Sequence, residues 1–505
     1  MNNLYESILA FQAYLLPLSF SVLMAFVMPR KLYLGMAPEL IVASLTLVAL
    51  QVIALVVVSI ARLQIEIPWH SASRFLIAIG CVALILNIRL LVKTLKSQYL
   101  QRYAYFTAPS LIIVLSCVLG PCLFGSHPWA AWDALDVYIP DAVSLIENLR
   151  SDDDRSPWQS SYVHPPAISA LAALVFLFDD NATSVTAYWL FNFYTVLLLV
   201  LAVLGIGRNL RLSGVETGML MLVGLMMPLV GNHLLLPGYL DYWVAINCLL
   251  AVSVIVGIFS HPANSSVITW GIVCILMFCM IWWKNSWPMY MLSVAVPLLY
   301  QALGNRYHAR GLVLLVLLVG FVMWPLLLFL PGSGLLGVLA ALGLFEVPYL
   351  GPVGISQMKW GWEENPYTLW VGGKEILLQL QSPRLVGQTF VTALYKNSSF
   401  TIMGVVYLIA LVSVCRSEPL RSNGGLVAIG TPSMMLVFFV IICFISPKFL
   451  FEYSAPGSDT GLSRFLQAWA LSVIPALGLM LSSVSEGPAQ PFDGEKRASP
   501  PVTEA

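Results

Sequence analysis

The sequence contains very little charge. Only 10% of its 505 residues are Asp, Glu, Lys or Arg, whereas soluble domains carry about 25%. This composition excludes a soluble globular enzyme, and it excludes a disordered chain, which needs high charge and low hydrophobicity. The 25 basic residues balance the 25 acidic residues. Nucleic acid is therefore not an expected partner, because its binding proteins carry basic patches.

Three further features are missing. The eight cysteines fall almost all inside apolar stretches, so they suggest neither a disulfide framework nor a metal site. No glycine-rich loop of the kind that holds nucleotide phosphates is present. The first residues have no basic segment and no evident cleavage site, so we expect the first apolar run to be retained.

Long apolar runs dominate the sequence instead. Hydrophobic residues make up 59% of the chain, and the mean hydropathy is +0.84. A helix needs about 20 apolar residues to cross a bilayer, and we count thirteen candidate spans. They predict an all-α fold, a polytopic transmembrane helical bundle with juxtamembrane helices in its external loops. The spans are 5–28, 39–61, 75–92, 107–125, 187–207, 214–231, 242–260, 267–283, 288–303, 311–330, 399–415, 425–446 and 465–485.

The charges in the loops predict the orientation of this bundle. One side carries 13 basic and 7 acidic residues, including the pairs Arg208/Arg211 and Arg416/Arg421, and the other 18 acids lie on the opposite side. The positive-inside rule makes the first side cytoplasmic. Residues 165–178 are apolar but too few to span. We therefore expect 126–186 to be one external loop whose apolar segment is an interfacial or re-entrant helix lying on the membrane.

The same pattern divides the chain into five regions. Residues 1–106 form an N-terminal three-span segment, and 107–330 form a membrane core with the external loop 126–186. An external region follows at 331–398, then the C-terminal spans at 399–485. The tail, 486–505, is polar and Pro-rich, so we expect it to be disordered and cytoplasmic.

Unusual polar residues gather at the predicted external ends of the spans. The first group is Trp132-Asp133-Ala134-Leu135-Asp136, which continues to Asp141. In a helix, Asp133 and Asp136 would share a face, and a carboxylate near an apolar surface can act as a general base. The alternative is a juxtamembrane loop with solvated acids and a Trp anchor.

Two further groups begin predicted helices. His164-Pro165-Pro166 precedes the short apolar helix, where a helix N-terminus and an imidazole together suit an anion. Gly238-Tyr239-Leu240-Asp241 opens the span 242–260. The alternatives are a simple helix start for the first group and an Asp241 N-cap for the second.

Basic residues on the acidic side form the last groups. Lys284-Asn285 lies between two spans, and Arg464 opens the final span. Their position against the positive-inside bias suggests an anionic partner such as a lipid phosphate. Snorkelling or helix anchoring is the alternative. The acidic run Asp152-Asp153-Asp154 is a possible divalent cation site, although a solvated loop is the more usual meaning of such a run.

Taken in this order, the motifs make the chain similar to the GT-C superfamily of polytopic glycosyltransferases, in its bacterial branch, which uses polyprenyl-phosphate sugars. Trp132-Asp133-Ala134 resembles the family's WDA motif, His164-Pro165-Pro166 its HPP motif, and Gly238-Tyr239-Leu240-Asp241 its GY-x-D motif. Lys284-Asn285 resembles the start of its K-N-E motif, but Ser286 stands where the family commonly has Glu. The resemblance covers roughly 107–300.

The resemblance implies a function and a set of roles. Asp133, with Asp136 as a second candidate, would deprotonate an acceptor hydroxyl, and the sugar would be transferred with inversion. His164, Lys284 and Arg464 would hold the lipid phosphate, while Tyr239, Asp241 and Asn285 complete the substrate-binding set. The implied partners are a polyprenyl-phosphate sugar, a glycan or lipid-linked acceptor and the bilayer, at the outer face of a bacterial inner membrane. A polysaccharide polymerase or ligase, or a lipid or solute transporter, remains an alternative.

Overall fold

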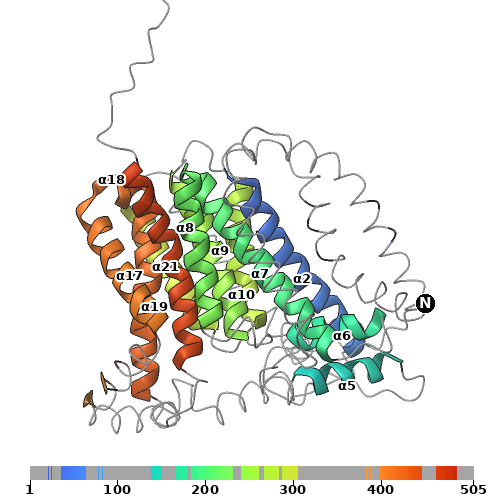
Figure 1. The fold of residues 1–505 in the computed structure, drawn as a ribbon. Helices are drawn as coiled ribbons and strands as arrows, with labels where there is room; N and C mark the ends of the chain where they lie inside the picture. The colour runs from blue at the N-terminus through green and yellow to red at the C-terminus, as the bar shows by residue number, and fades with distance from the viewer. Residues whose placement is uncertain are drawn as a thin grey trace, which may run out of the picture.

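A computed structural model describes residues 36–63, 138–150, 167–178, 184–230, 240–260, 267–283, 287–304, 398–445 and 462–485, with a few isolated positions elsewhere. These residues are helical almost throughout, and no strand occurs among them. The predicted all-α class is therefore confirmed for this part of the chain. The helices lie side by side as one bundle (Figure 1).

The helix bounds follow the apolar runs closely. The elements are α2 Pro38–Leu63, α5 Ile139–Arg150, α6 Ala167–Phe178, α7 Ser184–Asn209, α8 Gly214–Val230, α9 Leu240–Ser260, α10 Val267–Trp283, α11 Trp287–Gly304, α17 Ser398–Arg416, α18 Glu418–Leu420, the π-helical turn η4 Arg421–Gly425, α19 Leu426–Ile445 and α21 Leu462–Ser485. Nine predicted spans match nine of these helices, with ends that differ by at most three residues. The other four, 5–28, 75–92, 107–125 and 311–330, lie outside the described residues apart from isolated positions.

Several of these helices are suited to a membrane. By length and composition, four stretches could cross one: Glu39–Val58, Tyr242–Ser260, Glu418–Ile441 and Leu466–Ser483. Six shorter apolar helices accompany them. The described helices also carry charged side chains only in their terminal turns. Both features agree with a helical membrane protein.

Helix α9 lies at the centre of the bundle. It packs against α7, α10, α11, α19 and α21, and most of its side chains from Tyr242 to Ile258 are buried. A helix that is apolar on all sides is stable only when it is covered on all sides. The sequence of α9, which has no charged residue after Asp241, therefore explains its central place.

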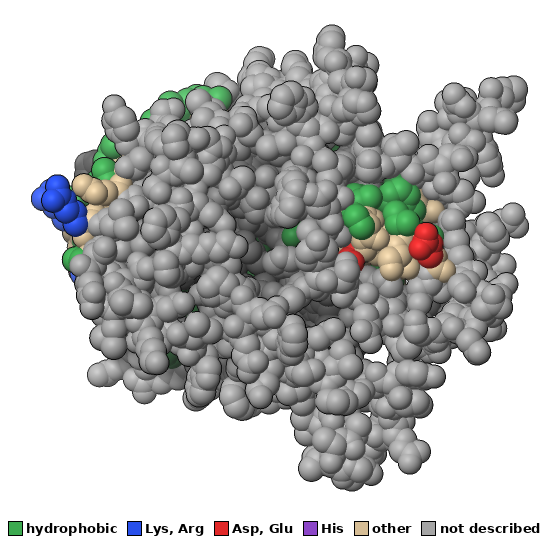
Figure 2. Space-filling model, turned by 90° about the horizontal axis from the view of Figure 1, so that it is seen from below, with side chains coloured by type: hydrophobic (Ala, Val, Ile, Leu, Met, Phe, Trp, Pro, Cys, Tyr) green, Lys and Arg blue, Asp and Glu red, His purple; other side chains and the backbone are tan. Residues whose placement is uncertain are grey.

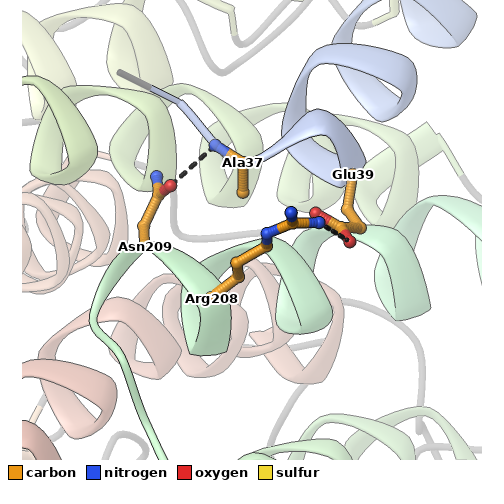
Figure 3. Close-up of polar contacts among 4 residues, drawn as sticks. All are labelled: Ala37, Glu39, Arg208 and Asn209. Atoms are coloured by element: carbon orange, nitrogen blue, oxygen red, sulfur yellow. Dashed lines mark hydrogen bonds and ion pairs between the residues drawn. The ribbon is translucent and has the colours of Figure 1, made fainter. Parts of the chain in front are cut away.

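The described parts of the predicted cytoplasmic loops lie together at one end of the bundle, which we call the arginine end. It comprises the start of α2, the α7–α8 turn, the ends of α9 and α11, and the α17–α19 connection. Arg208 forms an ion pair with Glu39 at 3.0 Å, and the backbone N–H of Ala37 donates to Asn209 Oδ1 at 2.7 Å (Figure 3). These two contacts join α2 to the end of α7.

The α17–α19 connection is also held at the arginine end. The Gln301 side chain of α11 donates to the backbone oxygen of Arg421 at 2.8 Å, and the Ser260 hydroxyl of α9 donates to that of Asn423 at 3.3 Å. Gly424 has φ +89°, which favours glycine. A Cβ at Gly424 would lie 3.1 Å from Val256 Cα, so this turn rests directly on the α9 backbone.

Helices α5 and α6 lie at the opposite end from α18 (Figure 1). Helix α6 has 12 residues, about 18 Å at 1.5 Å per residue, and it is too short to span, as predicted. The expectation that it lies on the membrane is wrong. Its side chains from Ala167 to Val175 are all buried, and it packs against α5, α2 and α7. An apolar helix covered by protein on every side has no face left for lipid.

Helix α5 covers α6 and provides the outer surface here. Tyr138, Ala142, Leu145 and Ile146 are buried, at the spacing of one helical face. The other side of α5 is exposed at Pro140, Val143, Ser144 and Glu147. Figure 2 shows a patch of hydrophobic and acidic side chains on the right of this face. Helix α5 thus buries one face against α6 and leaves the other face, which is partly apolar, exposed.

Candidate functional site

The helix ends that carry or adjoin motif residues in the sequence lie opposite the arginine end, and we call this end of the bundle the motif end. It comprises the starts of α9, α11 and α21 and the end of α10. Asp241 lies in the first turn of α9 and Arg464 in the first turn of α21, although nothing is described of their side chains. Asp133, Asp136, His164, Tyr239, Lys284 and Asn285 lie outside the described residues.

The motif segments nevertheless adjoin described elements at this end. Lys284 directly follows α10, and Tyr239 directly precedes α9. Asp136 lies two residues before Tyr138, where the described α5 segment begins, and His164 lies three residues before α6. Because α9 packs against both α10 and α21, the structure brings together the starts of α9 and α21 and the end of α10.

A pair of tryptophans joins α9 to α10 at the motif end. The rings of Trp243 and Trp283 stack with centroids 4.7 Å apart and planes 18° from parallel. Both side chains are buried. Trp243 lies two residues after Asp241, and Trp283 is the residue before Lys284. The stack therefore holds the start of α9 and the end of α10 at the same level of the bundle.

Five buried polar groups near this end have no hydrogen-bond partner within the described part of the chain. They are the Tyr242 hydroxyl, the Trp283 and Trp469 indole N–H groups and the Asn247 and Gln467 carboxamides. All five lie within seven residues of a helix end at the motif end, which is about 10 Å along a helix. Buried polar groups are normally paired. Each of the five can donate a hydrogen bond to an oxygen atom.

Helices α5 and α6 also lie at this end of the bundle (Figure 1). Helix α6 packs against α5 and α7 and also contacts α10. Asp141, a further acid of the first motif group, is buried on the inner face of α5 in its first turn. A carboxylate there is stabilised by the helix N-terminus. Asp141 therefore lies against the core and not at the surface of α5.

The proposed cation site lies outside what the structure describes. Asp152, Asp153 and Asp154 are all in that part of the chain. Within the described residues, no group of three or more His, Cys, Asp and Glu side chains is placed to hold a metal ion.

Sequence reasoning missed the residues that organise the motif end. The Trp243–Trp283 stack could not be predicted, because tertiary packing determines which helices lie next to one another. Gln467 was overlooked, although a carboxamide inside an apolar span is a visible signal. Helix α5 was also missed, although Tyr138, Ala142 and Leu145 follow a helical period.

Comparison with known proteins assigns no family to the chain. No family model matches the chain, and neither a curated protein nor a solved structure matches it.

Proposed function

We propose that this protein is a membrane glycosyltransferase. It transfers a sugar from a polyprenyl-phosphate donor to a glycan, lipid or protein acceptor, and its motif end faces the outside of a bacterial inner membrane. The full bundle has about thirteen spans in this proposal. The arginine end faces the cytoplasm, in keeping with the positive-inside rule.

One observation carries the proposal. Among the described residues, five buried donor groups without partners, on Tyr242, Asn247, Trp283, Gln467 and Trp469, occur on the three helices that also carry or adjoin Asp241, Lys284 and Arg464. Sugar hydroxyls and phosphate oxygens accept hydrogen bonds from such donors. A lipid-linked donor keeps its phosphate at the level of the headgroups, which is where the helix ends of a membrane protein lie.

The chemistry of the motif residues in this proposal is the one that the resemblance to the GT-C superfamily implies. Asp133 takes the proton from the acceptor hydroxyl, and the oxygen attacks the anomeric carbon of the sugar. The bond to the phosphate oxygen breaks, and the configuration inverts. Lys284, Arg464 and His164 stabilise the charge that gathers on the departing phosphate.

The alternatives are disfavoured by the distribution of charge. A transporter would be expected to place ionisable groups near the middle of its helices, and the described helices carry charge only in their terminal turns. A polymerase or ligase is expected to use external arginines. Those predicted in external loops are few, namely Arg150, Arg155, Arg384 and Arg464.

Reconstituted protein tests the proposal. We expect transfer from a labelled polyprenyl-phosphate sugar, and a ten- to a hundred-fold higher donor KM in Lys284→Ala and Arg464→Ala. This corresponds to the loss of a charge-assisted hydrogen bond worth about 1.5–3 kcal/mol. Arg421→Ala is the matched control, because Arg421 is exposed at the arginine end, and its KM should not change. Transfer from a soluble nucleotide sugar without a lipid carrier would refute the mechanism.

A further inference from the structure

Helix α2 carries an unexpected row of polar groups in its buried face. The row Leu40, Ser44, Leu47, Gln51, Ala54 and Val58 repeats at intervals of four and three residues, as one face of a helix does. All six side chains are buried, and Gln51 is only 6% exposed. The Ser44 hydroxyl and both polar atoms of the Gln51 carboxamide have no partner. A Cβ at Gly205 would overlap Leu40, so this face is turned toward α7.

Helix α9 has a matching face. Trp243, Asn247, Leu250, Val254 and Gly257 follow the same spacing, and the four side chains are almost fully buried. Both polar atoms of the Asn247 carboxamide lack a partner. At one end of this face, Trp243 stacks on Trp283 of α10. At the other end, Gly257 abuts Asn209 of α7. Helix α2 packs against α7, α10 and α9, so the two faces border one interface.

The three polar groups lie at successive levels along the bundle axis. Positions along the axes of α2 and α9 can both be measured from Asn209, because Asn209 accepts a hydrogen bond from the N–H of Ala37, directly before α2, and adjoins Gly257 of α9. At 1.5 Å per residue, Ser44 lies about 10 Å, Asn247 about 15 Å and Gln51 about 21 Å from that level. Asn247 is therefore about 5 Å along the axis from each α2 group. Two hydrogen bonds through one water molecule span about that distance.

The chemistry of this interface selects its occupant. The two carboxamides offer donors and acceptors, and the hydroxyl offers both. The charged side chains described at this interface, Glu39 and Arg208, pair with each other at the arginine end. No other charged side chain is described beside Gln51 or Asn247, so an ion there would lack a described counter-charge. Buried water normally makes two to four hydrogen bonds with such groups.

We infer that Ser44, Gln51 and Asn247 bind ordered water within the bundle, in the middle of the interface between α2 and the core helices α7, α9 and α10. This water couples the N-terminal segment to the helix that carries Asp241. The inference is independent of the proposed glycosyltransferase activity, because it rests only on buried polar groups. It gives α2 a binding role that none of the sequence motifs suggested.

A double-mutant cycle tests the bridge. Gln51→Leu and Asn247→Leu each remove a carboxamide with little change in volume, and each should lower the Tm of the purified protein, since water and the other amide lose a partner. The double variant should lose less than the sum of the two single losses. Gln51→Leu with Gln467→Leu is the matched control. Gln467 is also a buried carboxamide without a partner, but on α21, and these two losses should add.

Two results would overturn the inference. The first is additive losses for Gln51→Leu and Asn247→Leu, or an increase in Tm for either single variant. The second comes from a high-resolution structure of the unaltered protein, which does not depend on the folding of any variant. Ordered water in contact with Gln51 and Asn247 is the expected result. A dry interface, or a direct bond between the two carboxamides, would contradict it.

Discussion

The contact between Gly257 and Asn209 allows a stability change to be worked out in both sign and size. A Cβ at Gly257 would overlap the Asn209 amide nitrogen. Asn209 is buried, and its Oδ1 accepts from the Ala37 N–H at 2.7 Å. Gly257→Ala must therefore displace the amide that ties α7 to the start of α2 (Figure 3).

The contributions to the free energy of unfolding do not cancel. Loss of the hydrogen bond costs about 0.5–1.5 kcal/mol, and overpacking costs about 1–3 kcal/mol. Replacing a helical glycine by alanine stabilises by about 1 kcal/mol. The free energy of unfolding should therefore fall by about 1–3 kcal/mol. SDS titration of the protein in mixed micelles, followed by tryptophan fluorescence, measures the change.

Gly271 provides the matched control in α10. A Cβ there meets no atom of the described residues within 4 Å, so only the helix propensity changes. Gly271→Ala should leave the free energy of unfolding unchanged or raise it by up to about 1 kcal/mol. Equal effects of the two substitutions would refute the packing described for α9 and α7.

Three further predictions follow from the motif end and the arginine end. Asp133→Asn should lower turnover by about 10²–10⁴-fold without loss of folded protein, and Asp136→Asn should have a smaller effect on turnover. Wild-type turnover in Asp133→Asn would show that another group is the base. Trp283→Ala should lower the free energy of unfolding by about 3–5 kcal/mol, because it removes a buried ring stacked at 4.7 Å on Trp243. Trp283→Phe should lower it less. An unchanged free energy of unfolding for Trp283→Ala in SDS titration would contradict the stack. Gly424→Ala should cost about 1–3 kcal/mol in the same assay, since φ is +89°, and Gly424→Asn should cost less; the reverse order would contradict this conformation.

The helix ends were predictable because charge and polarity mark them. Residues 267–283 were predicted as one apolar run, and α10 has the same ends, with Lys284 directly after it. Arg208 and Glu39 were predicted on one side of the membrane, and they form an ion pair. Hydrophobicity along the chain determines which residues can be covered by lipid or protein, so it determines helix length as well.

The environment of each helix was not predictable in the same way. The sequence of α6 is apolar all round, and this pattern is the same whether lipid or protein covers the helix. Its burial under α5 depends on a neighbour whose amphipathic pattern was overlooked. The ties between Trp243 and Trp283 and between Ala37 and Asn209 join residues far apart in the chain. Such pairs follow from tertiary packing, which periodicity does not specify.

The most direct test of the proposed glycosyltransferase is a structure of the protein bound to a non-transferable polyprenyl-phosphonate sugar. The account predicts the phosphonate at the motif end, between the starts of α9 and α21 and the end of α10, with oxygen atoms of the ligand bonded to Lys284 or Arg464. The sugar should lie within reach of Asp133. A ligand bound at the arginine end, beside Arg208 or Arg421, would contradict the proposed site and its orientation.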